Sequence, residues 1–304
     1  MRKRYLTPPM MLAMTVLAAF LASACFAQEV TSGKRDGSAI QVLIVDGQNN
    51  HNWRESTPVL KRDLEETGLF EVTVATADDG GKMDEFNPKF SDYDVVVMNY
   101  NGASWNENTK KAFLEYVENG GGVVIYHAAN NAFTDWKEYN QMIAIGGWGG
   151  RNKAFGPYLY VQDGKPVVDH DSDGPGGGHG PQHEYQLELY EPHPITKGLP
   201  QKFMHTEDEL YSWLRGPAEN VKIIAYSHSP TDKGGSGRNE PQLMTISFGK
   251  GRIFHTTLGH AGRQCRSVAF IITFVRGTQW AATGVVTIPV PPDMPTDEKS
   301  MMRD

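Results

Sequence analysis

The sequence predicts an α/β fold with a mostly parallel sheet, helices on both faces of that sheet and a β-rich C-terminal half. In the first half, short apolar runs alternate with segments of helical periodicity, a pattern typical of parallel strands covered by helices. In the second half, apolar or alternating runs follow one another with few helical segments between them. At 304 residues, 39% of them hydrophobic, the chain is long enough for one sizeable domain.

In the first half we expect strands at residues 41–45, 71–75, 93–99 and 123–126. Helices are expected at 56–67, with Pro58 in the first turn, and at 106–118, closed by Asn119 and the glycines 120–122. A glycine-rich segment, 146–183, follows. Because it contains Trp148, His170, His179 and His183, we expect it to form a lid or wall of a functional site.

In the second half we expect strands at 185–190, 221–226, 242–248 and 252–257, with a hairpin turn at 249–251 between the last two. Residues 267–282 are expected to form a closing helix. The tail carries prolines at 289, 291, 292 and 295 and is therefore expected to be extended.

The N-terminus is typical of a secretory signal: Arg2, Lys3 and Arg4 precede an apolar stretch over 10–22 and then small residues. We expect a signal peptide at 1–27, a linker at 28–38, the main domain at 39–291 and a tail at 292–304, in an exported, periplasmic or extracellular protein. A membrane partner is expected only if Cys25 is lipidated. Cys265 is interpreted as a structural thiol. The net charge of −7 argues against a nucleic-acid partner.

Histidines stand where predicted strands end. His127 follows the apolar run 123–126, and His51 follows the first strand beyond Gly47. Since the carboxyl ends of parallel strands meet at one edge of a sheet, both imidazoles are candidate catalytic groups there. His260, beyond Gly259 after the last strand, is a third candidate. The alternative is that each is a hydrogen-bonded loop histidine.

Residues 205–211 combine an imidazole, three carboxylates and a tyrosine. Asp208 and Glu209 are candidates for a general acid or base, or for a group that orients a histidine. The remaining candidates are assigned to substrate binding: His179, His183, His205, Trp53, Trp148 and Tyr211. His179 and His183 are four residues apart, but Pro181 excludes the regular helix of an HExxH zinc site. Zinc ligation from loops stays an alternative, so metal and cofactor are left open.

The sequence lacks a G-x-S-x-G elbow, a P-loop and a G-x-G-x-x-G turn after the first strand. Serine hydrolase, phosphotransferase and dinucleotide-binding functions therefore lose their usual support.

Five ordered motifs resemble the ThuA-like, trehalose-utilisation family: GGVVIYHAA (121–129), HGPQH (179–183), HPITKGLP (193–200), DELY (208–211) and GRIFHTTLGH (251–260). The likeness extends over about residues 41–291. It implies a flavodoxin-like sheet of the class I glutamine amidotransferase-like superfamily, in which the strand ending at His127 corresponds to the one that carries a catalytic cysteine. Histidine at this position disfavours thiolate glutaminase chemistry. The family is linked to the breakdown of disaccharides and of oxidised, keto-type sugars.

Three hypotheses follow. The first is an exported enzyme on a glycoside or keto-sugar, either a hydrolase or a lyase, in which His127 and His51 flank a small-molecule carbohydrate and Asp208 or Glu209 assists proton transfer. The second is a metal-dependent hydrolase with some of the histidines as ligands. The third is a noncatalytic sugar-binding protein of the cell envelope. The sequence leaves the oligomeric state open.

Overall fold

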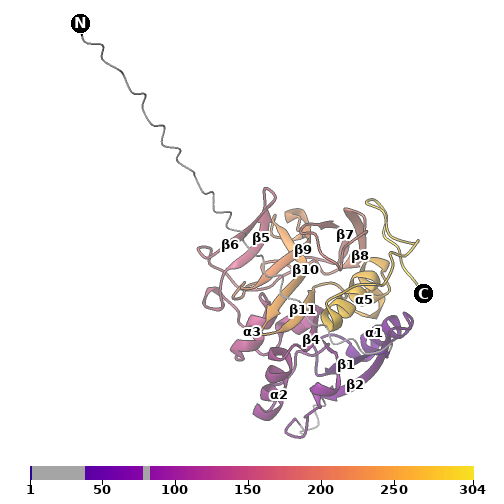
Figure 1. Ribbon diagram of the computed structural model, residues 1–304. Coiled ribbons are helices and arrows are strands. Elements are labelled where there is room, and N and C mark those ends of the chain that lie inside the picture. Colours follow the sequence, from indigo (N-terminus) through magenta and orange to yellow (C-terminus); the bar gives the residue numbers. More distant parts are fainter. Residues whose placement is uncertain (2–37, 78–82) are drawn as a thin grey trace. The chain divides into compact units, whose positions relative to one another are not determined.

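An 11-stranded mixed sheet forms the centre of the fold (Figure 1). The computed structural model describes residues 38–77 and 83–304 together with Met1. The expected signal peptide, Cys25 and nearly all of the expected linker lie outside the described residues. The strands are β1 (Ile40–Gly47), β2 (Phe70–Ala77), β3 (Val95–Met98), β4 (Gly122–Tyr126), β5 (Tyr158–Gln162), β6 (Lys165–Asp169), β7 (His183–Leu189), β8 (Lys202–Asp208), β9 (Val221–His228), β10 (Asn239–Phe248) and β11 (Gly251–Thr256).

The main sheet has the order β2-β1-β3-β4-β11-β10-β9-β7-β8, and the hairpin β5–β6 is attached to β10. The five strands from β2 to β11 pair in parallel, so the expectation of a mostly parallel sheet is met only in this part. From β11 to β8 every pairing is antiparallel, which is the expected β-rich half. The carboxyl ends of β1, β4 and β11, three strands of the parallel part, therefore lie at the same edge of the sheet.

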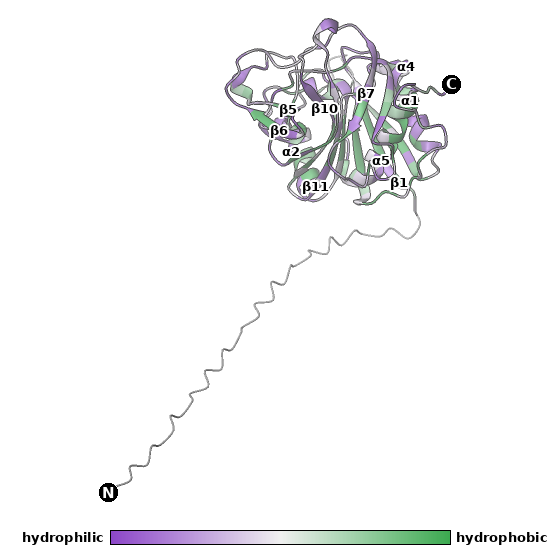
Figure 2. Ribbon diagram, turned by 90° about the horizontal axis from the view of Figure 1, so that it is seen from above, coloured by the Kyte–Doolittle hydropathy of each residue, from purple (hydrophilic) through white to green (hydrophobic). Residues whose placement is uncertain are grey.

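Helices cover both faces of the parallel part, as expected (Figure 1). They are α1 (Trp53–Glu65), α2 (Glu107–Glu118), α3 (Lys137–Ile143), α4 (Gly262–Cys265) and α5 (Val268–Thr283). α1 and α5 pack with Val42, Ile44 and Val124 on one face, whereas α2 and α3 pack with side chains of alternate residues in the same strands on the other. β3 and β4 are buried along their whole length and β1 along most of it, as expected for strands covered on both faces, and the centre of the sheet is largely apolar in Figure 2. Among the described residues, none of the helices has the length and apolar character needed to cross a membrane.

Several elements differ from the sequence-based expectation, including the short helices α3 and α4, which were not expected. α1 begins at Trp53, because the carbonyl of Asn52 accepts hydrogen bonds from the backbone of Glu55 and Ser56; Pro58 therefore lies beyond the first turn. The glycine-rich segment contains the hairpin β5–β6. β8 was not expected, since its sequence KFMHTED has neither an apolar run nor clear alternation.

Glu240 in β10 is a buried carboxyl, 2% exposed, whose Oε1 has no hydrogen-bond partner among the described residues. Burial raises its pKa from 4.5 to about 7, against smaller effects of Ser236, the backbone of Trp213 and Arg238. Ionisation of an acid whose pKa is raised in the folded state lowers the free energy of unfolding. The free energy of unfolding is therefore expected to fall as the pH rises from 4.5 to about 7.

Glu240→Gln stays neutral at every pH. We expect it to raise the free energy of unfolding by on the order of 3 kcal/mol above pH 7 and to leave it nearly unchanged below pH 4.5. Urea denaturation of both proteins on either side of this window measures the difference, with the exposed Glu219→Gln as control. Equal stability at all pH values would contradict the prediction.

Candidate active site

Three histidines from separate loops meet at the carboxyl edge of the parallel strands. His51 lies in the loop after β1, His127 directly follows β4, and His260 lies in the loop between β11 and α4. The imidazole centroid of His51 is 4.9 Å from that of His127 and 4.6 Å from that of His260. The structure thus brings together all three histidines that the sequence proposed as catalytic.

The loops hold His127 and His260 in defined backbone conformations. His127 has a φ of 44°, an uncommon value for a residue other than glycine, at the point where the chain turns from β4 into a short 3-10 helix, His127–Asn131. Gly259, before His260, has a φ of 100°. A Cβ at this position would lie 2.7 Å from the Tyr126 ring and 2.9 Å from the Phe270 ring, so only glycine fits here.

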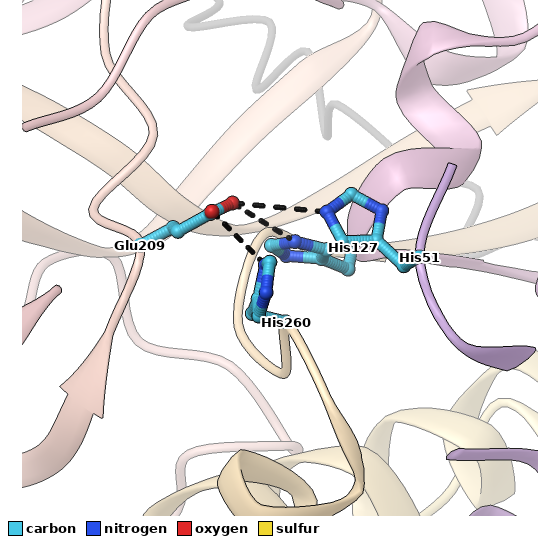
Figure 3. Close-up of side chains that lie close together, drawn as sticks. All are labelled: His51, His127, Glu209 and His260. Atoms are coloured by element: carbon cyan, nitrogen blue, oxygen red, sulfur yellow. Dashed lines mark ion pairs between the residues drawn. The ribbon is translucent and has the colours of Figure 1, made fainter. Parts of the chain in front are cut away.

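Glu209, directly after β8, supplies the carboxylate of the site (Figure 3). Its Oε2 lies 3.6 Å from His127 Nε2 and 3.8 Å from His51 Nε2, and its Oε1 lies 3.0 Å from His260 Nδ1. The side chain is 10% exposed and His127 only 1%. One atom from each of these four residues lies within 4.8 Å of the others. We name this set, His51, His127, Glu209 and His260, the His3Glu cluster.

Hydrogen bonds fix the tautomers of two of these histidines. His127 Nδ1 lies 2.5 Å from the carbonyl oxygen of Thr257, which can only accept, so Nδ1 carries a proton. His51 Nδ1 lies 3.3 Å from Asn49 Oδ1, which is an acceptor because the backbone N–H of His51 also donates to it. In the neutral form of each ring the Nε2 lone pair therefore faces Glu209.

His260 Nδ1 is buried and, despite its short distance to Glu209, has no partner of hydrogen-bond geometry among the described residues. Three ring nitrogens thus lie within 3.8 Å of one carboxylate. Lone pairs that face a carboxylate are repelled unless a proton or a cation lies between them. Either a proton on one of the rings or a bound cation would complete this arrangement.

Charge and burial oppose each other in the cluster. Burial alone raises the pKa of Glu209, but the adjacent His127, His260 and His51 outweigh it, and the pKa is held well below its usual range. Burial lowers the pKa of His51, with a further contribution from the neighbouring histidines. The carboxylate of Glu209 raises the pKa of His260. Glu209 is therefore ionised and His51 is neutral near pH 7.

Tyr211, Trp148 and His179 form one wall of the site. The Tyr211 hydroxyl lies 2.9 Å from His127 Nε2, and its ring centroid is 4.6 Å from that of Trp148. His179 Nε2 lies 3.4 Å from Glu209 Oε1. Trp148 and His179 belong to the glycine-rich segment, where the backbone of Trp148 donates to Gly176. That segment therefore contributes to the wall of the site, and the partly exposed indole of Trp148 offers a flat apolar surface there.

The other sequence-predicted residues lie outside the His3Glu cluster. Asp208 is fully buried and accepts a hydrogen bond from His205 Nε2 at 2.8 Å, so it orients a histidine instead of facing the cluster. His183 lines a separate pocket of about 220 Å³ between β7 and β9. Trp53, at the start of α1, stacks under the Arg54 guanidinium at 4.2 Å, and no contact with the cluster is seen among the described residues.

Two asparagines that the sequence analysis overlooked support His51. Asn49 accepts from the His51 backbone and donates to Asn99 Oδ1 at 3.1 Å. Asn99 in turn donates to Ser56 and Thr57 in α1. The run GQNNHN before a helix was the available signal, but asparagines are ordinary in such loops. Partners of this kind commonly orient metal-binding histidines.

The donor set fits a divalent first-row metal ion. Imidazole nitrogens and a carboxylate are ligands of zinc, and imidazole also suits iron, nickel and copper. Tetrahedral bonds of 2.0–2.1 Å place ligand atoms about 3.3 Å apart, inside the range of separations in the cluster. An ion held here could polarise a carbonyl or activate a water molecule.

The family model for trehalose utilisation, ThuA, matches residues 41–281. A ThuA-like protein from Parabacteroides merdae ATCC 43184, known from a crystal structure, has 49% sequence identity and a TM-score of 0.85, over 88% of this chain and 98% of that one. A second ThuA-like protein, from Bacteroides uniformis ATCC 8492, has 18% identity and a TM-score of 0.55, over 83% and 94% of the two chains; it shows the shared fold. Comparison with curated proteins finds no match.

Proposed function

The chain belongs to the ThuA, trehalose-utilisation family, and from this premise we propose that it is an exported, metal-dependent enzyme acting on trehalose or a related disaccharide, including keto-glycosides. Membership supports a role in trehalose utilisation. The observation that carries the metal is the His3Glu cluster, in which two ring nitrogens of fixed tautomer face a buried carboxylate. Export rests on the N-terminal sequence pattern.

A metal ion held by the His3Glu cluster would supply positive charge to the substrate and orient it. Metal ions act as Lewis acids toward substrate oxygens and lower the pKa of bound water. His179, exposed beside Glu209, is placed to exchange a proton with a group at the cluster. Trp148 and Tyr211 supply aromatic surface of the kind on which an apolar sugar face can pack. Together these features support hydrolysis or elimination at a glycosidic carbon.

Acid–base catalysis without a metal was the first hypothesis from the sequence, and the structure gives a reason to prefer the metal. The free Nε2 lone pair of a histidine can also act as a general base toward a substrate. In the His3Glu cluster the protonated nitrogens of His51 and His127 point outward to Asn49 and Thr257, and both Nε2 atoms face the carboxylate of Glu209. The Nε2 atoms then converge on one point, an arrangement suited to a shared cation.

Elemental analysis of the purified protein starting at residue 28 tests the proposal. We expect about one divalent metal ion per chain, removed by a chelator together with turnover of trehalose or a keto-glycoside, and both restored by adding the metal back. A metal-bound protein should also unfold at a higher temperature than the stripped one. Full turnover by protein free of metal would contradict the proposal and restore the acid–base hypothesis.

A further inference from the structure

The pocket between β7 and β9 is formed where these two strands separate. Among the described residues, the pairing of the strands ends at Glu188 and Tyr226, and His183 and His228 lie beyond it, toward the start of β7 and the end of β9. Both histidines line the pocket. Its volume of about 220 Å³ is smaller than the pockets of about 300–1,000 Å³ that hold drug-sized ligands. The pocket is therefore suited to a small molecule or to one part of a larger one.

The pocket lies at the same edge of the sheet as the His3Glu cluster. His183 pairs with Asp208 in the neighbouring strand β8, and Glu209 of the cluster directly follows Asp208. His183 is also four residues from His179, whose Nε2 lies 3.4 Å from Glu209 Oε1. Four residues of chain span at most about 14 Å. The pocket is thus close enough to the cluster to hold a neighbouring part of the same substrate.

The segment that joins His179 to His183 is fixed against the loop after β9. A Cβ at Gly180 would lie 1.6 Å from the carbonyl oxygen of Lys233, so the two segments touch with no room for a side chain. Pro230 and Lys233 of that loop line the pocket. The two segments therefore form a preformed rim of the pocket, continuous with the wall of the active site that carries His179.

The imidazole of His183 supplies a hydrogen-bond acceptor. Its Nδ1 lies 2.9 Å from the carbonyl oxygen of Pro181, which can only accept, so Nδ1 carries a proton and Nε2 has a lone pair in the neutral ring. His183 Nε2 is buried and has no hydrogen-bond partner among the described residues. A buried acceptor without a donor costs free energy. A ligand in the pocket that donates a hydrogen bond to this nitrogen would remove that cost.

The other lining groups suit a ligand rich in hydroxyl groups. The ring of Tyr226 is half-buried, and its hydroxyl interacts with the carboxylate of Glu188, whose charge is offset by Lys202 at 3.0 Å. Asn239 and Lys233 add N–H donors to the lining. An aromatic ring can pack against the apolar face of a sugar, while donors and acceptors around the ring bind its hydroxyl groups. This combination favours a saccharide.

We propose that the pocket is a saccharide-binding subsite, which holds a sugar residue of the substrate next to the one that reacts at the His3Glu cluster; as a subsite it rests on the function proposed above. A hydroxyl of the bound sugar donates to His183 Nε2, and the sugar ring packs on Tyr226. Contacts made away from the reacting bond position the substrate for reaction. The motif HGPQH then serves both sites, with His179 at the cluster and His183 in the pocket.

NMR of the protein starting at residue 28, with isotope-labelled histidine and zinc in the buffer, tests the subsite with trehalose as the probe. The imidazole signals of His183 and His228 report on the pocket, and those of His127 and His260 report on the cluster. We expect trehalose to shift the signals of both pocket histidines in a saturable way. Glycerol at the same concentration should shift them little, because it has no sugar ring to pack on Tyr226.

Substitutions in the pocket identify the groups that bind. His183→Phe keeps a ring beside Tyr185 but removes the acceptor, and we expect trehalose affinity, read at His228, to fall by about 5- to 10-fold. Tyr226→Leu should have a similar effect, whereas Tyr226→Phe keeps the ring and should bind nearly as wild type does. The exposed His170, on the same glycine-rich segment, is the matched control, and His170→Ala should leave the affinity unchanged. In turnover, His183→Phe should raise KM and leave kcat nearly unchanged.

The subsite and the proposed function fail in different ways. Shifts confined to His127 and His260, or shifts at no histidine, would overturn the subsite and leave the metal-dependent function to its own test. Equal shifts with glycerol, or wild-type affinity in folded His183→Phe and Tyr226→Leu, would also overturn it. Saturable shifts at His183 and His228 in a protein that binds no metal would reject the metal-dependent function but support the pocket as a saccharide site.

Discussion

Glu209→Gln is expected to weaken zinc binding by more than about 100-fold, the upper figure for loss of an outer-shell partner, and to abolish turnover. The change removes the negative charge that faces the ring nitrogens of His51, His127 and His260. Glutamine has nearly the shape of glutamate, so the packing around β8 is retained. The loss of a charged ligand in a site only 10% exposed is not compensated by solvent. Competition with a chromophoric chelator measures the affinity.

Glu207→Gln is the matched control, because Glu207 lies two residues away on β8 and is exposed, paired with Arg263. A second measurement does not depend on the metal: in stripped protein the carboxylate of Glu209 raises the pKa of His260, so Glu209→Gln should lower it. Histidine NMR titration follows this change. Unaltered zinc affinity in Glu209→Gln would remove the carboxylate from the ligand set, whatever happens to His260.

The sequence predicted that two of the site histidines lie at one edge of the sheet. Apolar runs of four or five residues mark β1, β3 and β4 as strands buried on both faces, and parallel strands bring their carboxyl ends to one edge. His51 and His127 were therefore expected at the same edge, whereas His260 was a separate candidate whose place beside them follows from the parallel pairing of β11 with β4. The glycine-rich segment was also predicted to be near the site, because it carries Trp148 and His179.

The role of each carboxylate was not predictable. Asp208 and Glu209 are adjacent in the sequence, but Asp208 accepts hydrogen bonds from His205 and from backbone groups, whereas Glu209 faces the cluster. Which of the two carboxylates reaches the cluster depends on the position of β8. Three strands separate β8 from β11 in the sheet order, yet Asp208 contacts the loop after β11. This contact depends on the curvature of the sheet, which leaves no local signal in the sequence.

Asp208→Ala is expected to lower the free energy of unfolding by about 3–5 kcal/mol, the usual cost of removing one member of a buried charged pair. Asp208 accepts four hydrogen bonds: from His205 Nε2 and the backbone N–H of Gly259 on Oδ2, and from the backbone N–H groups of Glu209 and His260 on Oδ1. His205 is also fully buried and contacts Ser267. Alanine leaves all of these donors without an acceptor in a site that excludes water. Urea denaturation measures the loss.

The pH dependence of that loss identifies its cause. Burial by itself raises the pKa of Asp208, but the hydrogen bond and charge of His205, with His127 and Gly259, outweigh it and lower the pKa below 3.8. The stabilisation is therefore fully present above pH 3.8 and is lost as the pH falls through the folded-state value. The difference in the free energy of unfolding between wild type and the milder variant Asp208→Asn should accordingly shrink in strong acid, whereas Glu207→Ala should differ little from wild type at any pH.

Since Asp208 holds the backbone of both Glu209 and His260, folded Asp208→Asn should also bind zinc about 10- to 100-fold more weakly. Normal zinc affinity in that variant would mean that the two ligands keep their positions without Asp208.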